Sequence, residues 1–283
     1  MEKKRRVITL LSIPSIWLLL FFVLPFTIML LFSIRETTFS PIFPPTLSHY
    51  IEFLTTPVYL RLLLSSAWIA FVTAVITILL AYPLAYYLIF HGGKHRLALL
   101  SFLILPAWTS YLLRVLAWKV ILGSNGIINT FLLSLGLIDE GMPIFLYSQS
   151  AVIITLVYVW IPYAALPIFS TLERIDIKLI EASQDLGASP LRTFLRVTLP
   201  LSTPGLVSAF FFVFIPSLGE WVTPSLVGGA DGIMYGNLVQ TQFLRGLNWP
   251  MGTVMSTVLL LIVSVFTMLF NRHVTMKEMS ALA

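Results

Sequence analysis

Residues 181–200 read EASQDLGASPLRTFLRVTLP and form the most polar segment in a chain that is otherwise largely apolar. Just before it, Asp176 is a good N-cap for a helix beginning at Ile177. Gly187 suits the left-handed residue that follows the end of a helix, because glycine adopts positive φ without a steric penalty. The first half of the stretch therefore predicts one helix and a tight turn.

The second half predicts another helix. Ser189 can cap it, and Pro190 fits its first position, where the missing N–H has no intrahelical partner to lose. Pro200 is expected to end this helix, because proline lacks the N–H that a continuing helix needs. The whole stretch thus predicts a helix-turn-helix unit.

An apolar stripe runs along the second predicted helix at positions i, i+3, i+4 and i+8, and two basic residues lie one turn apart on another face. The stripe consists of Leu191, Phe194, Leu195 and Leu199, and the basic pair of Arg192 and Arg196. Such a unit can dock into a groove of another protein. It can also lie on the inner membrane surface with its arginines at lipid headgroups, and these features alone leave both interpretations open.

The composition around this stretch identifies an integral membrane protein. The 283 residues are 58% hydrophobic and only 10% charged, with a mean hydropathy of +0.95, whereas soluble chains carry about 25% charged residues. The absence of cysteine excludes disulfides, thiolate metal sites and a thiol nucleophile. The basic residues are few and close to apolar segments, so we expect them to orient the chain in a lipid membrane and not to bind nucleic acid.

The chain is expected to be all-α, with six transmembrane helices of about 20 or more residues each. A GSNG break at 123–126 interrupts the apolar piece 116–137, which we therefore expect to be an interfacial or re-entrant segment and not a seventh span. The N-terminal apolar run is too long for a cleaved signal peptide and is expected to form the first span. The predicted spans are about 8–33, 62–90, 97–117, 150–172, 204–227 and 251–270.

Basic residues predict the orientation. With both termini in the cytoplasm, twelve Lys and Arg residues fall on the inner side and five on the outer side, which also places 181–200 inside. The inner set is Lys3, Lys4, Arg5, Arg6, Lys94, Arg96, Arg174, Lys178, Arg192, Arg196, Arg272 and Lys277; the outer set is Arg35, Arg61, Arg114, Lys119 and Arg245.

The spacing within 181–200 resembles the E-A-A, G, I-x-L-P signature of the membrane subunits of binding-protein-dependent ABC importers. Glu181, Ala182, Gly187, Leu199 and Pro200 match it, whereas Ser183 replaces an alanine and Val197 an isoleucine. The resemblance implies a type I ABC importer permease fold with one permease domain over 1–283. It also implies that a cytoplasmic loop at about 173–203 couples the pore to an ATPase.

The resemblance extends along the chain to the permeases of spermidine/putrescine importers, through segments such as LGEWVTPSLVGG at 218–229. It implies two ATPase subunits, a second permease expected to form a heterodimer, an extracytoplasmic binding protein and a polyamine substrate in the cell inner membrane. Related permeases carry iron(III), opines or phosphonates, which remain the alternative. The chain has no phosphate-binding loop, so it is not expected to be an enzyme, and ATP hydrolysis is expected in a partner.

Other chemistry finds little support. His91 and His95 have helical spacing, but two glycines separate them and no third ligand is placed, so no metal or cofactor is expected. A membrane-embedded enzyme would need a nucleophile with a base, and none is visible. A channel or secondary transporter would share the composition but would not need the signature at 181–200.

Glu220 is the one acidic residue predicted well inside a span, with Pro216, Gly219 and Pro224 loosening the helix around it. Burying a charge in a membrane costs about 2.5–3.5 kcal/mol, so such residues tend to face a cavity or a partner. Glu220 is therefore a candidate cation contact, with a helix-joining hydrogen bond as the alternative. Six aromatic side chains could add cation–π contacts to an ammonium group, although belts at the membrane surface use the same residue types. They are Trp108, Tyr111, Trp118, Tyr158, Trp160 and Trp221.

Overall fold

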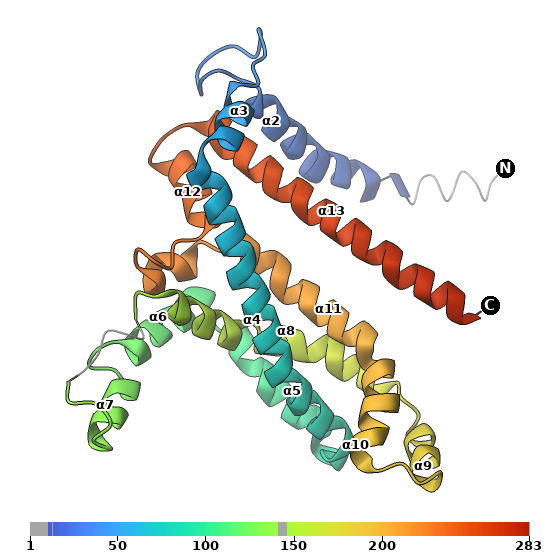
Figure 1. Cartoon of the computed structure of the whole chain (residues 1–283). Helices are drawn as coiled ribbons and strands as arrows, with labels where there is room; N and C mark the ends of the chain where they lie inside the picture. Colours follow the sequence, from blue (N-terminus) through green and yellow to red (C-terminus); the bar gives the residue numbers. More distant parts are fainter. Residues whose placement is uncertain (1–10, 13, 141–145, 283) are drawn as a thin grey trace, which may run out of the picture. The chain divides into compact units, whose positions relative to one another are not determined.

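The computed structural model describes residues 11, 12, 14–140 and 146–282, with side chains up to residue 268. This part of the chain contains helices and turns but no strand (Figure 1). Six of its helical stretches are long and apolar enough to cross a bilayer, which confirms the predicted all-α fold and the number of spans. They are Pro14–Ser33, Pro57–Phe90, Tyr111–Ser134, Gln149–Glu173, Pro190–Leu218 and Trp249–Met268.

One compact unit combines the two ends of the chain, residues 1–61 and 238–283. Here α2 (Leu24–Ser33), preceded by the π-helical segment η1 (Leu19–Val23), packs along α13 (Trp249–Leu282). The hydroxyl of Thr38 donates to the carbonyl of Leu247 at 2.5 Å and accepts from the N–H of Trp249 at 3.0 Å. The first predicted span thus packs against the last one.

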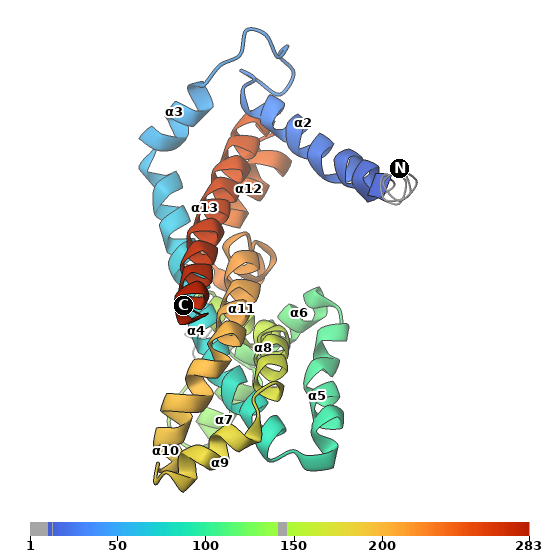
Figure 2. The ribbon, with the colours of Figure 1, turned by 90° about the vertical axis from the view of Figure 1, so that its right-hand side faces the viewer.

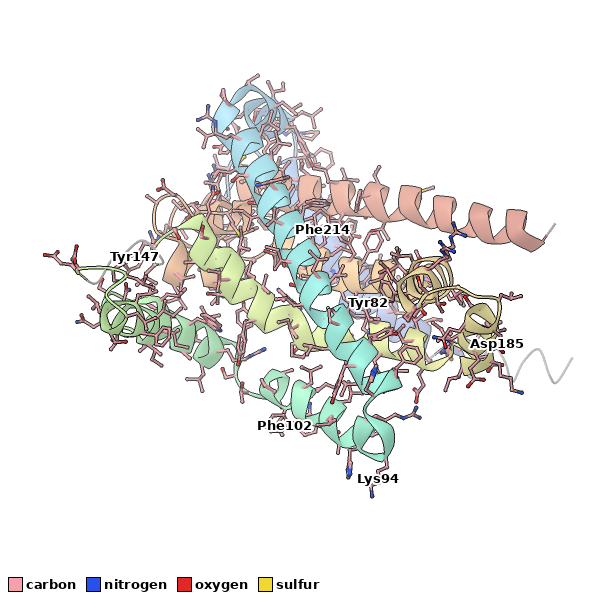
Figure 3. All side chains as sticks on the ribbon, turned by 60° about the horizontal axis from the view of Figure 1, so that its bottom comes forward. Tyr82, Lys94, Phe102, Tyr147, Asp185 and Phe214 are labelled. Atoms are coloured by element: carbon pink, nitrogen blue, oxygen red, sulfur yellow. The ribbon has the colours of Figure 1, made fainter. Side chains whose placement is uncertain are left out.

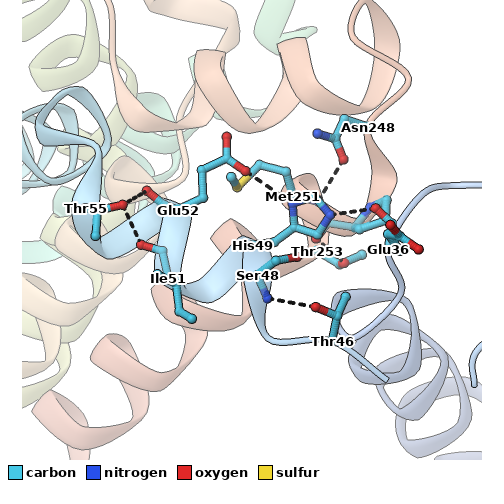
Figure 4. A network of polar contacts seen from close by, with 11 residues as sticks. Glu36, Thr46, Ser48, His49, Ile51, Glu52, Thr55, Asn248, Met251 and Thr253 are labelled. Atoms are coloured by element: carbon cyan, nitrogen blue, oxygen red, sulfur yellow. Dashed lines mark hydrogen bonds and ion pairs between the residues drawn. The ribbon is translucent and has the colours of Figure 1, made fainter. Parts of the chain in front are cut away.

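The loop from residue 34 to residue 47 is held against α3 (Ser48–Thr55) by a polar network (Figure 4). The ring of His49 lies 2.9 Å from the carbonyl of Glu36 through Nε2 and 3.4 Å from the carboxylate of Glu52 through Nδ1. Phe39 and Phe43 nevertheless remain 91% and 77% exposed. The loop therefore has internal polar anchors and two protruding aromatic rings.

The second compact unit spans residues 62–237. In chain order its helices are α4 (Pro57–Phe90, which begins in the first unit), η2 (Gly93–His95), α5 (Arg96–Ile104), η3 (Leu105–Trp108), α6 (Tyr111–Leu122), α7 (Ile127–Ser134), α8 (Gln149–Glu173), α9 (Ile177–Asp185), α10 (Pro190–Thr193), η5 (Phe194–Thr198), α11 (Leu199–Leu218), η6 (Pro224–Gly228) and α12 (Tyr235–Leu244), the last of which continues into the first unit.

Small residues allow α8 and α11 to pack closely in this unit. A Cβ atom on Gly205 would lie 2.6 Å from Thr171 Oγ1 and 2.8 Å from the carbonyl oxygen of Pro167. Ala164 and Ala209 are fully buried in the adjoining apolar cluster. Close packing through small residues is the usual way in which helices associate in a membrane, where lipid removes the hydrophobic driving force.

The predicted span 97–117 differs from the structure. The chain forms α5 and the 3₁₀ turn η3, then an extended residue, Ser110, and only then α6; Figure 2 shows α5 and α6 as separate helices. Pro106 explains the interruption, because its ring and missing N–H disfavour a regular helix. The predicted GSNG break is present, since α6 ends at Leu122 and α7 begins at Ile127. The apolar piece 116–137, which we expected to be interfacial or re-entrant, nevertheless overlaps the candidate span Tyr111–Ser134.

The predicted span 204–227 also differs. The helix that contains α11 starts already at Pro190 and ends at Leu218. Glu220 therefore lies in a break between α11 and η6 and not in the interior of a helix, which corrects the prediction. The closely spaced Pro216, Gly219 and Pro224, which we expected only to loosen the helix, accompany this interruption.

Candidate functional site

The α9–α10 unit, residues 176–200, lies at one end of the second compact unit (Figure 1). The carboxylate of Asp176 caps α9 by accepting the N–H of Lys178 at 3.0 Å, as predicted. At the other end Gly187 has φ +82°. The N–H groups of Gly187 and Ala188 donate to the carbonyls of Gln184 and Ser183 at 2.8 and 3.1 Å, which completes a Schellman motif.

The second helix starts as predicted but does not end at Pro200. Ser189 Oγ accepts the N–H of Arg192 at 3.4 Å, and Pro190 occupies the first turn. The chain then passes through the π-helical segment η5 into α11, with Pro200 in the first turn of α11. The wider π turn accommodates the proline, because it relieves the clash of the ring with the carbonyl four residues earlier. The predicted stop at Pro200 is wrong for this reason.

The two helices of the α9–α10 unit are joined by one side-chain hydrogen bond. Ser183 Oγ and Thr193 Oγ1 lie 3.0 Å apart, and Thr193 is only 2% exposed. The Ser183 hydroxyl comes from the signature position that carries alanine in the family it resembles. The sequence alone does not indicate this pair, because nothing local predicts which residue of the second helix faces Ser183.

The predicted apolar stripe divides between two environments. The ring of Phe194 contacts Tyr82 and Tyr86 edge-on, at 5.8 Å in each case, and Leu199 packs against the same cluster. Figure 3 labels Tyr82 of this cluster. Leu191 and Leu195 remain 68% and 51% exposed. Of the signature residues, Glu181, Ala182, Gly187 and Pro200 are exposed, so that they are available to another protein.

A cavity of about 450 Å³ opens between α9 and the second helix. Its wall is mostly small or apolar, with two basic side chains, and consists of Leu179, Ala182, Ser183, Leu186, Ala188, Arg192, Arg196 and Val197.

A salt bridge lies near the start of the unit. Arg96 at the start of α5 forms a 2.9 Å salt bridge with Glu173 at the end of α8. This salt bridge anchors the end of α8, from which the chain leads into the unit.

The carboxylate of Glu220 caps the helical turns that follow the break. Its Oε1 accepts the N–H groups of Trp221, Val222 and Thr223 at 3.1, 2.8 and 3.1 Å. Its Oε2 accepts the hydroxyl of Tyr111 at 2.7 Å, and the same hydroxyl lies 2.6 Å from Thr223 Oγ1. The structure thus brings two of the predicted substrate-path residues, Tyr111 and Glu220, together.

Arg114 is a member of this neighbourhood that the sequence analysis placed in an outer segment. It is only 7% exposed, its Nη1 donates to the carbonyl of Val159 at 3.4 Å, and its guanidinium lies 5.8 Å from the centre of the Tyr111 ring. Arg114 lies three residues after Tyr111, and helical spacing places such residues side by side on one face. This spacing could have predicted that Arg114 belongs to the neighbourhood of Tyr111. Of the other predicted residues, Trp221 is 43% and Trp108 86% exposed.

The described residues hold no group of three or more His, Asp or Glu side chains arranged for a metal ion. The ring of His91 stacks on Tyr87 at 5.6 Å.

The chain belongs to the family of binding-protein-dependent transport system inner membrane components, which it matches over residues 4–277. It is thus a multi-pass inner membrane permease component. The spermidine/putrescine transport system permease protein PotB of Escherichia coli (strain K12) is 36% identical over 259 residues, covering 90% of this chain and 93% of that protein. The inner membrane ABC transporter permease protein YdcU of the same strain is 31% identical over 234 residues, covering 78% and 74%.

A solved structure supports the fold. The crystal structure of a bacterial ABC transporter involved in the import of the acidic polysaccharide alginate contains a chain that matches with a TM-score of 0.73 at 17% identity, over 96% of both chains. At this identity the match concerns the fold alone. The family and fold predicted from the signature at 181–200 are confirmed.

Proposed function

We propose that this chain is the permease subunit of an ATP-driven importer that carries a polyamine such as spermidine or putrescine across the inner membrane. The observation that carries the proposal is the 36% identity with PotB over 90% of this chain. The site near Glu220 is consistent with such a cargo. A carboxylate beside aromatic rings offers both charge and cation–π attraction to an amine, whose charge is costly to bury alone.

The partners in this proposal are two ATPase subunits, a second and different permease, and an extracytoplasmic binding protein. Six spans with a single α9–α10 unit would form half of a pore with approximate two-fold symmetry. We propose that both compact units belong to one permease domain, whose coupling loop runs from about 173 to 203. Within that loop Glu181, Ala182, Gly187, Leu199 and Pro200 would form the contact with the ATPase.

The mechanism we propose uses the continuity of the helix from Pro190 to Leu218. Its 29 residues would span roughly 44 Å at 1.5 Å per residue. ATP binding would close the ATPase pair and move the α9–α10 unit. This motion would pass along the helix to the break at Glu220, so that the Glu220 neighbourhood is exposed alternately to the two sides.

The orientation that we propose has both termini in the cytoplasm, which agrees with the distribution of basic residues. The loop 34–47 would then face outwards. Its exposed rings, Phe39 and Phe43, would contact the binding protein, because protruding aromatic side chains are typical anchors of protein interfaces.

The function can be tested by transport. We would express the chain with its ATPase, second permease and binding protein in a host without polyamine uptake, and measure entry of labelled spermidine and putrescine. Uptake should occur with the intact complex and disappear when the ATPase is inactivated by mutation. Absence of uptake of either polyamine, with transport of another solute instead, would contradict the proposed cargo.

A further inference from the structure

We propose that the cavity of the α9–α10 unit receives an acidic side chain of the ATPase subunit. This inference rests on the proposed function, because it assumes an ATPase partner. In this arrangement the α9–α10 unit docks on the ATPase, and a carboxylate side chain of the ATPase in turn enters the cavity of the unit. Arg192 and Arg196 would bind that carboxylate.

The first observation is the arrangement of charge on the unit. Both arginines line the cavity, and neither forms a salt bridge with a carboxylate in the described residues. On α9 the cavity is lined by residues at i, i+3, i+4 and i+7, namely Leu179, Ala182, Ser183 and Leu186. The acidic residues of α9 lie elsewhere on the helix, and Figure 3 shows Asp185 on it.

Helical spacing explains why the carboxylates of α9 do not neutralise the arginines. Glu181 and Asp185 are four residues apart and share a face, which points away from the cavity wall. The cavity side therefore carries the two arginines, whereas the opposite face of α9 carries Glu181 and Asp185 together with Lys178. Such a charge distribution is complementary to a partner that presents a carboxylate.

The second observation is the shape and apolar rim of the cavity. Its volume of about 450 Å³ lies within the roughly 300–1,000 Å³ typical of binding pockets. Leu186, which is 88% exposed, lines the cavity, and two further leucines of the second helix, Leu191 and Leu195, are 68% and 51% exposed outside its wall. Apolar side chains around a charged pocket are typical of protein interfaces, in which arginine is also enriched. A protein segment fits both features better than a small free anion does.

The geometry of the cavity depends on contacts within the chain. The Ser183–Thr193 hydrogen bond holds α9 and the second helix together, and the Schellman motif at Gly187 fixes the turn that closes one end. The pocket is thus formed before the partner arrives, which reduces the entropy lost on binding.

We would test this with the complete importer, expressed with Arg192→Gln, Arg196→Gln or both replacements in the permease. We expect the amount of ATPase that co-purifies with the double variant to fall about tenfold or more. The dependence of wild-type assembly on salt concentration should weaken in the same variant, because buried charge pairs would be missing. Lys94→Gln, which removes an exposed positive charge outside the coupling loop and the cavity, is the matched control and should behave as wild type.

A second measurement begins with a chain that keeps both arginines. The chain has no cysteine, so Ala188→Cys places a single thiol in the cavity wall. Bound ATPase should protect this thiol from a negatively charged maleimide, and Arg192→Gln with Arg196→Gln should remove the protection. Binding of the double variant at wild-type level, with unchanged salt dependence and thiol protection, would overturn the inference.

Two other outcomes have distinct meanings. If the variants keep the ATPase but lose binding to nanodiscs containing phosphatidylglycerol, the arginines contact lipid headgroups and the inference is wrong. If the wild-type chain never co-purifies with any ATPase, the proposed function itself fails, and with it the premise of the inference.

Discussion

At the scale of single residues, the carboxylate of Glu220 is largely satisfied by this chain. Three N–H groups converge on Oε1, whereas Oε2 receives only the hydroxyl of Tyr111. Since a carboxylate has about four lone-pair sites, two on each oxygen, Oε2 keeps capacity for one further donor. If the proposed function is right, an ammonium group of the polyamine would bind there without displacing the cap.

We predict that Glu220→Gln lowers polyamine uptake about tenfold, equivalent to roughly 1.4 kcal/mol, because the charge is lost while size is kept. Glu220→Asp should do less harm. Tyr111→Phe is the matched control, since it removes one hydrogen bond and keeps the charge, and should reduce uptake less than about threefold. Uptake would be measured per assembled complex. Wild-type uptake by Glu220→Gln would show that a charge is not essential here.

Gly187 provides a second prediction at this scale. Its φ of +82° is costly for residues with a β-branched side chain, by more than the roughly 1–2 kcal/mol that an ordinary residue requires. Gly187→Val should abolish uptake and leave the chain inserted in the membrane, whereas Gly187→Asn should retain most uptake because asparagine tolerates this region. Transport assays and membrane fractionation would check both. Full activity of Gly187→Val would contradict the assignment of the turn.

The Ser183–Thr193 hydrogen bond predicts unequal losses of stability when one or the other partner is replaced. Ser183→Ala leaves the buried Thr193 hydroxyl without its partner and should cost about 1–2 kcal/mol, whereas Thr193→Val should cost less because Ser183 can still reach water. Chemical unfolding in detergent would measure both, and the double variant would give the coupling energy. A coupling energy of zero would show that the bond contributes nothing to stability.

At the scale of elements, the approach of α11 to α8 depends on Gly205. Gly205→Ala should lower the unfolding temperature, because the new methyl group would lie within 3 Å of the backbone carbonyl of Pro167 as well as of Thr171. Thr171→Ala should rescue it only in part, since the carbonyl remains. Ser208→Ala, on an exposed face of α11, is the control. Equal stability of all four proteins would exclude close packing at this point.

The π-helical segment η5 has a mechanical consequence at the same scale. Because the chain continues through Pro200 without a break, the second helix of the α9–α10 unit and α11 form one rod from Pro190 to Leu218. A helix that ended at Pro200 would have separated the unit from the membrane by a flexible joint. The rod instead connects the cavity between α9 and the second helix with the break at Glu220.

At the scale of the whole molecule, the orientation of the chain is open to a direct test. The chain has no cysteine, so Arg192→Cys and Glu140→Cys each introduce a unique thiol on opposite predicted sides. A membrane-impermeant maleimide should label position 140 in intact cells and position 192 only after the inner membrane is opened. The reverse pattern would contradict the orientation deduced from the basic residues.

The sequence by itself determined the class of fold, the number of spans, the caps of α9 and of the second helix, and the family. These features depend on residues close together along the chain: about twenty apolar residues cross a bilayer wherever they occur, and a cap needs only its own first turn. The signature at 181–200 is local for the same reason.

Only the tertiary structure decided which distant residues meet. Tyr111 and Glu220 are 109 residues apart, and their contact depends on how α6 packs beside the break after α11, which no periodicity encodes. The tertiary structure also decided whether the helix is interrupted at each proline. Pro106 and Pro216 accompany breaks, whereas Pro200 is absorbed by a π turn, because a proline only weakens a helix and the packing on either side determines whether the chain bends, widens or stops.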